Sequence, residues 1–181
     1  MSTSAVVVFA HPYPDRSRAG RGLLEAVRDL RGVEVRSLYA RYPDFAIDVE
    51  AEQAALLAAG VVVWQHPLYW YGAPAMLTLW FEKVLAHGWA YGRGGTQVRG
   101  KRVLWVTTTG APATGYARGQ MHGHPFEEFV PGIEQIATFC GMRWEPPIVV
   151  HGAHRISDAE LGARAGEYRA RLVELMEDAD A

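Results

Sequence analysis

The segment from Gln65 to Pro74 carries side chains suited to hold a flat ligand. Three aromatic residues and a glycine stand between two prolines, which is typical of a rigid turn with an accessible backbone. The segment follows the apolar, β-branched run Gly60–Trp64, which suits a strand buried inside a parallel sheet. Open α/β sheets bind flat ligands where such a strand ends. We interpret the turn as a platform for a planar cofactor ring; an aromatic loop packed as core is the alternative.

A second candidate site is Ser17-Arg18-Ala19-Gly20, at the start of the first expected helix. Free N–H groups and the helix dipole favour an anion there. Ser17 adds a hydroxyl, Arg18 a positive charge, and Gly20 allows close approach of the backbone. The segment predicts a phosphate site, although an ordinary N-cap serine with a solvated arginine fits the local sequence as well. The chain has neither a P-loop lysine pattern nor GxGxxG, which argues against an NTPase or a dinucleotide-type Rossmann domain.

A third polar loop begins at Thr108 and continues to about Pro125. The loops His11–Gly20, Pro67–Gly72 and Thr108–His122 each follow an expected strand, so they meet at one edge of the sheet. Together they can hold a phosphate, one face of a ring and the polar edge of that ring. A flavin needs all three contacts.

Five strands alternating with helices must position these loops, which predicts an α/β protein with a flavodoxin-like, doubly wound parallel sheet of order 2-1-3-4-5. We expect a single domain over residues 1–181. The expected strands are Ala5–Ala10, Val33–Tyr39, Gly60–Trp64, Val103–Thr107 and Met142–Val150. The first expected helix ends at Gly32. The next three span Asp48–Ala59, Pro74–Ala86 and Phe126–Cys140. The last begins at the capping box Ser157–Glu160, and we expect its tail, Glu177–Ala181, to fray.

The composition is that of a soluble globular protein, with 49% hydrophobic and 21% charged residues. A net charge of -2 argues against nucleic-acid binding. Cys140 is the only cysteine, which excludes an intrachain disulfide and a thiolate metal cluster, and we expect it to be inert core. Neither a signal peptide nor a membrane span is recognisable, so we expect a cytoplasmic protein.

Several short motifs together resemble a known family. They are Ala10–Pro14, Tyr42–Phe45 with Ile47-Asp48, Trp64–Pro67, Trp80–Val84, His87–Gly92 and Thr108–Gly110. The chain resembles the flavodoxin-like NAD(P)H:quinone reductases (the DT-diaphorase family) over nearly its whole length. More closely, it resembles the bacterial ancillary oxidoreductases of glutathione-gated potassium-efflux systems.

The resemblance implies a role for each loop. The phosphate region of the flavin would be held by the first loop, the isoalloxazine would pack on the second, and its pyrimidine edge would bond to the third. The implied cofactor-binding residues are His11, Ser17, Arg18, Ala19, Gly20, Pro67, Leu68, Tyr69, Trp70, Tyr71, Thr108, Thr109, Gly110 and Ala111. Two positions depart from the family pattern. Gly20 stands where asparagine is common, and Ala111 replaces a second glycine, so the loop must shift or be strained if that position needs a positive φ.

Tyr116 and His122 lie six residues apart in a glycine-spaced loop. The resemblance implies that this pair flanks the flavin. A phenol and an imidazole are suitable donors to stabilise charge near N1 and the C2 oxygen and to protonate a quinone oxygen. The alternative is a pair of polar residues on a mobile loop. We expect no metal, because His122 and His124 lack an evident third ligand, and we interpret His66, His87, His151 and His154 as structural or surface residues.

The sequence therefore predicts a flavoprotein that passes two electrons from NADH or NADPH through FMN, or alternatively FAD, to a quinone-like acceptor by a ping-pong mechanism. The alternative function is a regulatory subunit of a potassium-efflux transporter at the inner membrane. We also expect a homodimer, because Met76 and Leu79 widen the apolar face of their helix and Trp89 and Tyr91 lie in a Gly-rich connector.

Overall fold

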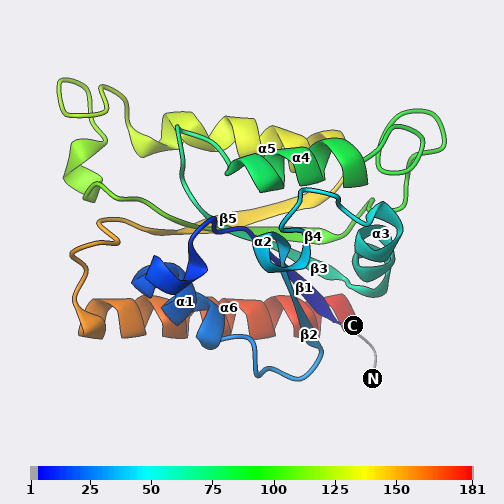
Figure 1. Cartoon of the computed structure of the whole chain (residues 1–181), viewed down its shortest axis with the longest axis horizontal. Helices are drawn as coiled ribbons and strands as arrows, with labels where there is room; N and C mark the ends of the chain where they lie inside the picture. Colours follow the sequence, from blue (N-terminus) through cyan, green and yellow to red (C-terminus); the bar gives the residue numbers. More distant parts are fainter. Residues whose placement is uncertain (1–3, 181) are drawn as a thin grey trace.

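The computed structural model, which describes residues 4–180, contains one five-stranded sheet (Figure 1). Every neighbouring pair of strands is parallel, and the strand order is β2-β1-β3-β4-β5. The predicted fold class and strand order are confirmed. The strands are β1 (Ala5–Phe9), β2 (Val33–Ser37), β3 (Val61–Pro67), β4 (Arg102–Thr108) and β5 (Arg143–Val150).

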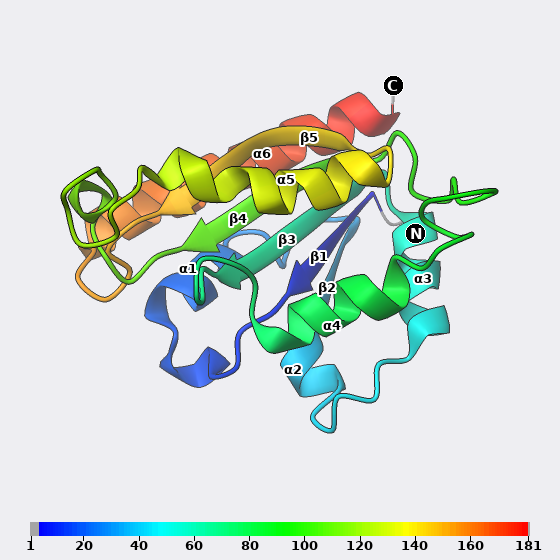
Figure 2. The same ribbon diagram turned by 90° about the horizontal axis from the view of Figure 1, so that it is seen from above.

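Helices cover both faces of the sheet. In Figure 1, α1 and α6 lie below the sheet and α4 and α5 lie above it; in Figure 2, which is seen from above, α4 and α5 lie in front of the sheet. The α-helices are α1 (Arg18–Glu25), α2 (Leu38–Arg41), α3 (Val49–Ala58), α4 (Ala75–Val84), α5 (Val130–Phe139) and α6 (Asp158–Asp180). Short 3-10 turns occupy Pro14–Arg16, Ala113–Gly115 and Phe126–Phe129. Within the described residues, no helix is both long and apolar enough to cross a bilayer.

Side chains of the central strands alternate between two hydrophobic cores. Val8 of β1, Trp64 of β3 and Trp105 of β4 belong to the core under α2 to α5. Their neighbours Val7 and Val63 belong to the core under α1 and α6. Because both faces are covered, these strands are apolar throughout, and this is the pattern that made them recognisable.

The expected helix starts at Asp48 and Ser157 are confirmed by their caps. The Asp48 carboxylate accepts a hydrogen bond from the N–H of Ala51 at 3.0 Å. The Ser157 hydroxyl accepts from the N–H of Glu160 at 3.2 Å, and the Glu160 carboxylate accepts in return from the N–H of Ser157 at 3.1 Å. These are the reciprocal bonds of a capping box.

The predicted strand Val33–Tyr39 is too long. β2 ends at Ser37, and Leu38–Arg41 form the short helix α2. Tertiary contacts override the alternating pattern here, because Leu38 is fully buried and the Tyr39 hydroxyl accepts a hydrogen bond from the N–H of Met76.

Other boundaries also differ from the sequence-based prediction. β3 continues through Pro67, paired to Thr108 of β4, so the aromatic turn begins at Leu68. The first helix ends at Glu25, before Gly32, and α6 extends to Asp180 without the predicted fraying at Glu177. Met1–Thr3 and Ala181 lie outside the described residues.

Candidate functional site

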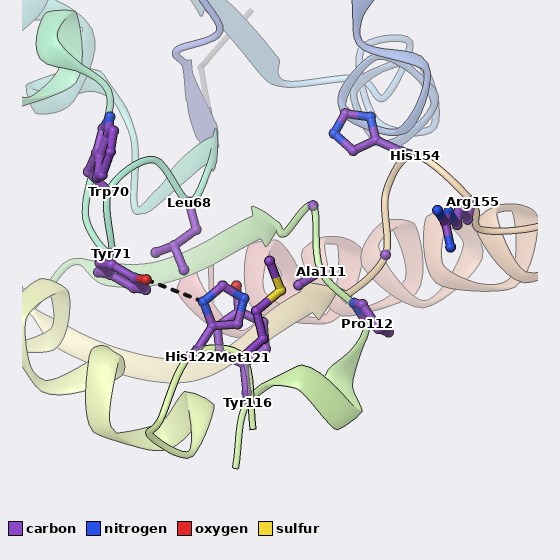
Figure 3. A pocket seen from close by; sticks show the side chains of 12 residues that line it. Leu68, Trp70, Tyr71, Ala111, Pro112, Tyr116, Met121, His122, His154 and Arg155 are labelled. Atoms are coloured by element: carbon purple, nitrogen blue, oxygen red, sulfur yellow. Dashed lines mark hydrogen bonds between the residues drawn. The ribbon is translucent and has the colours of Figure 1, made fainter. Parts of the chain in front are cut away.

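Two adjoining cavities open at the carboxyl ends of the strands, and they share Leu68, Gly110 and His154 in their walls. The smaller, of about 380 Å³, is lined by His11, Tyr13, Arg16, Ser17, Arg18, Ala19, Pro67, Leu68, Tyr69, Thr108, Thr109, Gly110, Ala153 and His154. The larger, of about 800 Å³ and drawn in Figure 3, is lined by Leu68, Trp70, Tyr71, Gly110, Ala111, Pro112, Tyr116, Met121, His122, Gly152, His154 and Arg155. The structure thus brings together every predicted site residue except Gly20, which lies buried in the first turn of α1.

The small cavity contains the start of α1. Ser17 is the N-cap, and its hydroxyl oxygen accepts a hydrogen bond from the N–H of Gly20 at 3.2 Å. The Arg18 guanidinium donates to the Asp158 carboxylate and to the carbonyl of Ile156, at the start of α6. The N-cap interpretation of Ser17 therefore holds, and Arg18 is ion-paired in this structure. Arg18 still lines the cavity, where a phosphate would compete with Asp158 for its guanidinium.

Gly20 makes room for the serine cap of its own helix turn. A Cβ atom at this position would lie 2.6 Å from the Ser17 Oγ atom, which is closer than side chains approach one another. The carbonyl of Gly20 also accepts from the side-chain amide of Gln65 at 2.8 Å. The serine cap thus occupies the space that a larger residue at position 20 would need.

The aromatic turn has an uncommon backbone. Trp70 and Tyr71 both have positive φ, of 49° and 64°, and hydrogen bonds in both directions join Tyr69 to Gly72. Tight turns of this kind normally place Asn-Gly at the two central positions. Two aromatic residues there store strain of roughly 1–3 kcal/mol each, a feature that clusters at ligand sites. The turn leaves Trp70 95% exposed beside the large cavity (Figure 3).

The loop from Thr108 to Ala111 is joined to the segment that follows β5. The N–H of Thr109 donates to the carbonyl of Val150, the N–H of Gly152 to the carbonyl of Ala111, and the N–H of Ala153 to the carbonyl of Thr109, all at 2.8–2.9 Å. Among the described residues, only three non-glycine residues have positive φ, and Ala111 is not one of them. The suspected strain at Ala111 is therefore absent.

His66 is a buried residue near the end of β3. Its Nε2 atom accepts from the Trp105 indole N–H at 2.8 Å, and its Nδ1 atom lies 2.9 Å from the Pro67 carbonyl oxygen, to which it donates. Burial lowers the pKa of His66 to about 4, although the bond to Pro67 acts in the opposite direction. The ring is therefore neutral and fixes the end of β3, as its interpretation as a structural residue required.

Tyr116 and His122 lie together on one wall of the large cavity. Their rings stack with centroids 4.1 Å apart and planes 12° apart, and the Tyr71 hydroxyl lies 3.3 Å from the His122 Nδ1 atom (Figure 3). Burial raises the pKa of Tyr116, and the nearby Thr109 hydroxyl acts in the opposite direction. The phenol therefore keeps its proton at neutral pH and can act as a donor.

Sequence reasoning missed the contribution of the segment after β5. His154, which we interpreted as a structural or surface residue, and Arg155, which the sequence did not single out, both line the large cavity. His151 lies 2.9 Å from the Thr109 hydroxyl oxygen. The rule that identified three loops at the carboxyl edge applies equally to this fourth loop.

The residues present fit a flavin mononucleotide. The N-terminus of α1 and two arginines, Arg16 and Arg18, line the smaller cavity, and the adjoining cavity has aromatic side chains in its walls. The Nε2 atom of His122 is buried with no hydrogen-bond partner in residues 4–180, which leaves a polar group for a ligand to satisfy. In the same residues, no group of three or more His, Cys, Asp or Glu side chains is placed to hold a metal ion.

A doubly wound sheet of order 2-1-3-4-5, with its ligand cavities at the carboxyl edge, defines the class of flavodoxin-like proteins. Residues 3–172 match the family described as Flavodoxin-like fold (Flavodoxin_2), and the chain belongs to this family.

Known relatives cover almost the whole chain. The sequence is 46% identical over 172 residues to the glutathione-regulated potassium-efflux system ancillary protein KefF of Klebsiella pneumoniae (strain 342), covering 95% of this chain and 96% of that protein. The structure of general stress protein 14 from Treponema denticola, in complex with FMN, is 33% identical with a TM-score of 0.88, covering 95% of this chain and 99% of that one. An NADPH-quinone reductase from P. pentosaceus is 25% identical with a TM-score of 0.82, covering 92% and 95%. The resemblance inferred from the sequence is confirmed.

Proposed function

We propose that this protein is a flavin-dependent NAD(P)H:quinone oxidoreductase that binds FMN, with FAD as the alternative. One observation carries the proposal: an anion-binding helix start, a strained aromatic turn and a protonated phenol line two adjoining cavities at one edge of the sheet. The FMN complex of general stress protein 14 and the NADPH-quinone reductase of P. pentosaceus support this assignment.

In this proposal each wall has a separate task. The start of α1, with Ser17 and Arg18, holds the phosphate, and the turn Leu68–Tyr71 supports the ring. The loop Thr108–Ala111 bonds to the polar edge of the ring. The flavin supplies the two-electron chemistry, and Tyr116 and His122 donate protons and hydrogen bonds to developing negative charge.

Absorbance spectroscopy of the purified protein tests the proposal. We expect a flavin spectrum that bleaches on addition of NADH or NADPH and recovers on addition of a quinone. Steady-state turnover should reach a kcat on the order of 1–1000 s⁻¹. Protein that neither carries flavin nor binds added FMN or FAD contradicts the proposal.

A second function rests on the KefF relatives, whose name describes an ancillary protein of a potassium-efflux system. In this alternative the chain docks on a transporter and its flavin site sets the docking state. Turnover with a small quinone, measured without any membrane, separates the two functions. Flavin-loaded protein that turns over far below 1 s⁻¹, the low end of the usual enzyme range, yet raises potassium efflux with the transporter, identifies a regulator.

We also infer a homodimer, on a surface that includes Tyr91 as expected but not Met76. Met76 is fully buried, so it cannot contribute to an interface. A groove of about 360 Å³ between α4 and α5 exposes apolar side chains instead, including Phe139, which is 63% exposed and packs on Tyr91 at 4.9 Å between ring centroids. Apolar surface of this kind marks interfaces. Light scattering should report a dimer at micromolar concentration, and Phe139→Glu should dissociate it.

A further inference from the structure

The two aromatic residues at the centre of the strained turn direct their side chains differently. Trp70 is exposed beside the large cavity, whereas the Tyr71 ring stacks on Phe129, with centroids 5.0 Å apart and planes 24° apart. In this position the Tyr71 hydroxyl lies 3.3 Å from the Nδ1 atom of His122, and the two rings meet edge-on at 5.8 Å between centroids (Figure 3). The turn, with a φ of 64° at Tyr71, thus places a hydroxyl beside His122.

The bond to Tyr71 is the only hydrogen bond that the His122 side chain makes within residues 4–180. The Tyr116 ring stacks on the imidazole at 4.1 Å, which fixes the plane of the imidazole but not the direction of each nitrogen. A half-turn of the imidazole about its Cβ–Cγ bond would keep that stacking and exchange the two edges of the ring. The Tyr71 hydroxyl therefore fixes which edge faces the cavity.

The chemistry of the two groups decides which of them donates. A phenol O–H is more acidic than the N–H of a neutral imidazole, and the unprotonated ring nitrogen is the stronger acceptor. The Tyr71 hydroxyl therefore donates, and Nδ1 of His122 accepts. The bond at one nitrogen of a histidine sets the protonation of the other. The proton of a neutral His122 is thus held on Nε2.

The Nε2 atom of His122 lies near the Thr108–Ala111 loop, which is proposed to bond to the polar edge of the flavin. A Cβ atom built on Gly115 would lie 4.0 Å from this Nε2 atom and 3.6 Å from the Cβ atom of Ala111. Ala111 and His122 both line the large cavity, and Nε2 is buried with no partner in the described residues. The wall of the cavity therefore holds an N–H donor that lacks an acceptor.

We propose that Tyr71 is a positioning residue for His122. Its hydroxyl holds the imidazole in the orientation and the tautomer that present Nε2–H to developing negative charge. This inference rests on the proposed function, and it gives Tyr71 a task beyond supporting the ring. The hydroxyl transfers no proton and acts only through His122. Without this bond the imidazole turns over and exchanges tautomers, so that it presents the donor for only part of the time.

The first test compares Tyr71→Phe with wild type in cofactor-free protein. Phenylalanine keeps the ring that stacks on Phe129 and removes only the hydroxyl. Nitrogen-15 NMR should find His122 protonated at Nε2 in wild type, and protonated partly at each nitrogen in Tyr71→Phe. The imidazole of His124, which is bonded to Glu128, is an internal control whose tautomer should stay the same.

The second test uses flavin-loaded protein. Both half-reactions of Tyr71→Phe should slow about 3- to 30-fold, less than after loss of the donor itself. The dissociation constant of FMN should stay within about twofold of wild type, because the aromatic ring is kept. In a His122→Ala background, Tyr71→Phe should slow neither half-reaction further, because the hydroxyl acts through His122.

The outcomes separate this inference from the proposed function. An unchanged His122 tautomer, or wild-type rates, in Tyr71→Phe would show that His122 is positioned without Tyr71. Equal slowing by Tyr71→Phe with and without His122 would show that the hydroxyl acts on its own. Each of these results overturns the inference and leaves the proposed function intact. A wild-type protein without flavin chemistry overturns the proposed function, and with it the inference, whatever the tautomer.

Discussion

Two polar clusters lie inside this protein, and they differ in how completely the protein satisfies them. The Glu52 cluster, between β2, α3 and α4, consists of Arg36, Tyr42, Glu52 and Trp80. The Glu52 carboxylate is fully buried and accepts from Arg36 at 2.6 and 2.8 Å, from Tyr42 at 2.6 Å and from Trp80 at 2.9 Å. Every polar atom that it buries has a protein partner, which is typical of a cluster that stabilises a fold.

The Tyr116 cluster, made of Thr109, Tyr116, His122 and His151, is organised differently. Its rings stack beside a cavity, the Nε2 atom of His122 has no partner within residues 4–180, and a second cavity opens behind His151. Incomplete hydrogen bonding is costly in a core but useful where a ligand completes it. We propose from this contrast that the Glu52 cluster stabilises the fold and that the Tyr116 cluster takes part in the reaction.

The largest effect should follow Glu52→Ala. It leaves the Arg36 guanidinium buried without its main partner, which should lower the free energy of unfolding by about 3–5 kcal/mol. Chemical denaturation measures the loss. Glu50→Ala, at an exposed position of the same helix, is the control, and equal losses in the two variants would show that the Glu52 cluster contributes little.

Changes in the Tyr116 cluster should do the opposite. Tyr116→Phe and His122→Ala should slow electron transfer about 10- to 1000-fold, because each removes a donor to developing negative charge. Flavin content should change little, and so should the unfolding free energy. Stopped-flow rates of both half-reactions provide the measurement, with His124→Ala as control. Rates equal to those of wild type would mean that Tyr116 and His122 are polar loop residues without a role in electron transfer.

A pH effect on stability should come from His66, a buried residue of β3 that belongs to neither cluster. Its pKa is about 4 in the folded protein and about 6.5 in the unfolded chain. Above pH 6.5 both states are neutral, and below it only the unfolded state binds the proton. Stability is therefore lost between pH 6.5 and 4, with about 2 kcal/mol lost from pH 7 to pH 5. Denaturation at the two pH values should show a smaller difference for His66→Phe, and an unchanged difference would contradict the assignment.

The smallest effect should come from the aromatic turn. Trp70→Asn replaces a residue strained by its positive φ with one that tolerates that backbone, and Trp70 buries almost nothing. The cofactor-free protein should gain up to about 1 kcal/mol in unfolding free energy, while flavin binding should weaken. Met121→Asn, at an exposed residue without positive φ, should bring no such gain. A lower unfolding free energy in the Trp70→Asn variant would mean that the backbone at Trp70 is not strained.

The same division explains what could be predicted from the sequence. The strand order and the three ligand loops were predictable, because central strands covered on both faces are apolar throughout and their ends share one edge. The burial of Glu52 was not predictable, because a glutamate in a short helix is usually exposed. Its partner Arg36 lies on a different element, and only the fold brings the two together. His151 was missed because its partner Thr109 lies in the loop after β4, far from it in the sequence. The positive φ of Trp70 and Tyr71 had no sequence signal, since neither is Gly or Asn.

The three backbone hydrogen bonds that join Thr109–Ala111 to Val150–Ala153 have a consequence for protein engineering. The two segments lie about forty residues apart in the chain, yet these hydrogen bonds hold their backbones in a fixed relative position. If a chimera receives only the Thr108–Ala111 turn from a relative, the backbone donors and acceptors of that turn can lack their hydrogen-bond partners in Val150–Ala153. Both segments should therefore be transferred together when this wall of the site is moved into another protein. A mutant library that varies one segment should leave the sequence of the other unchanged.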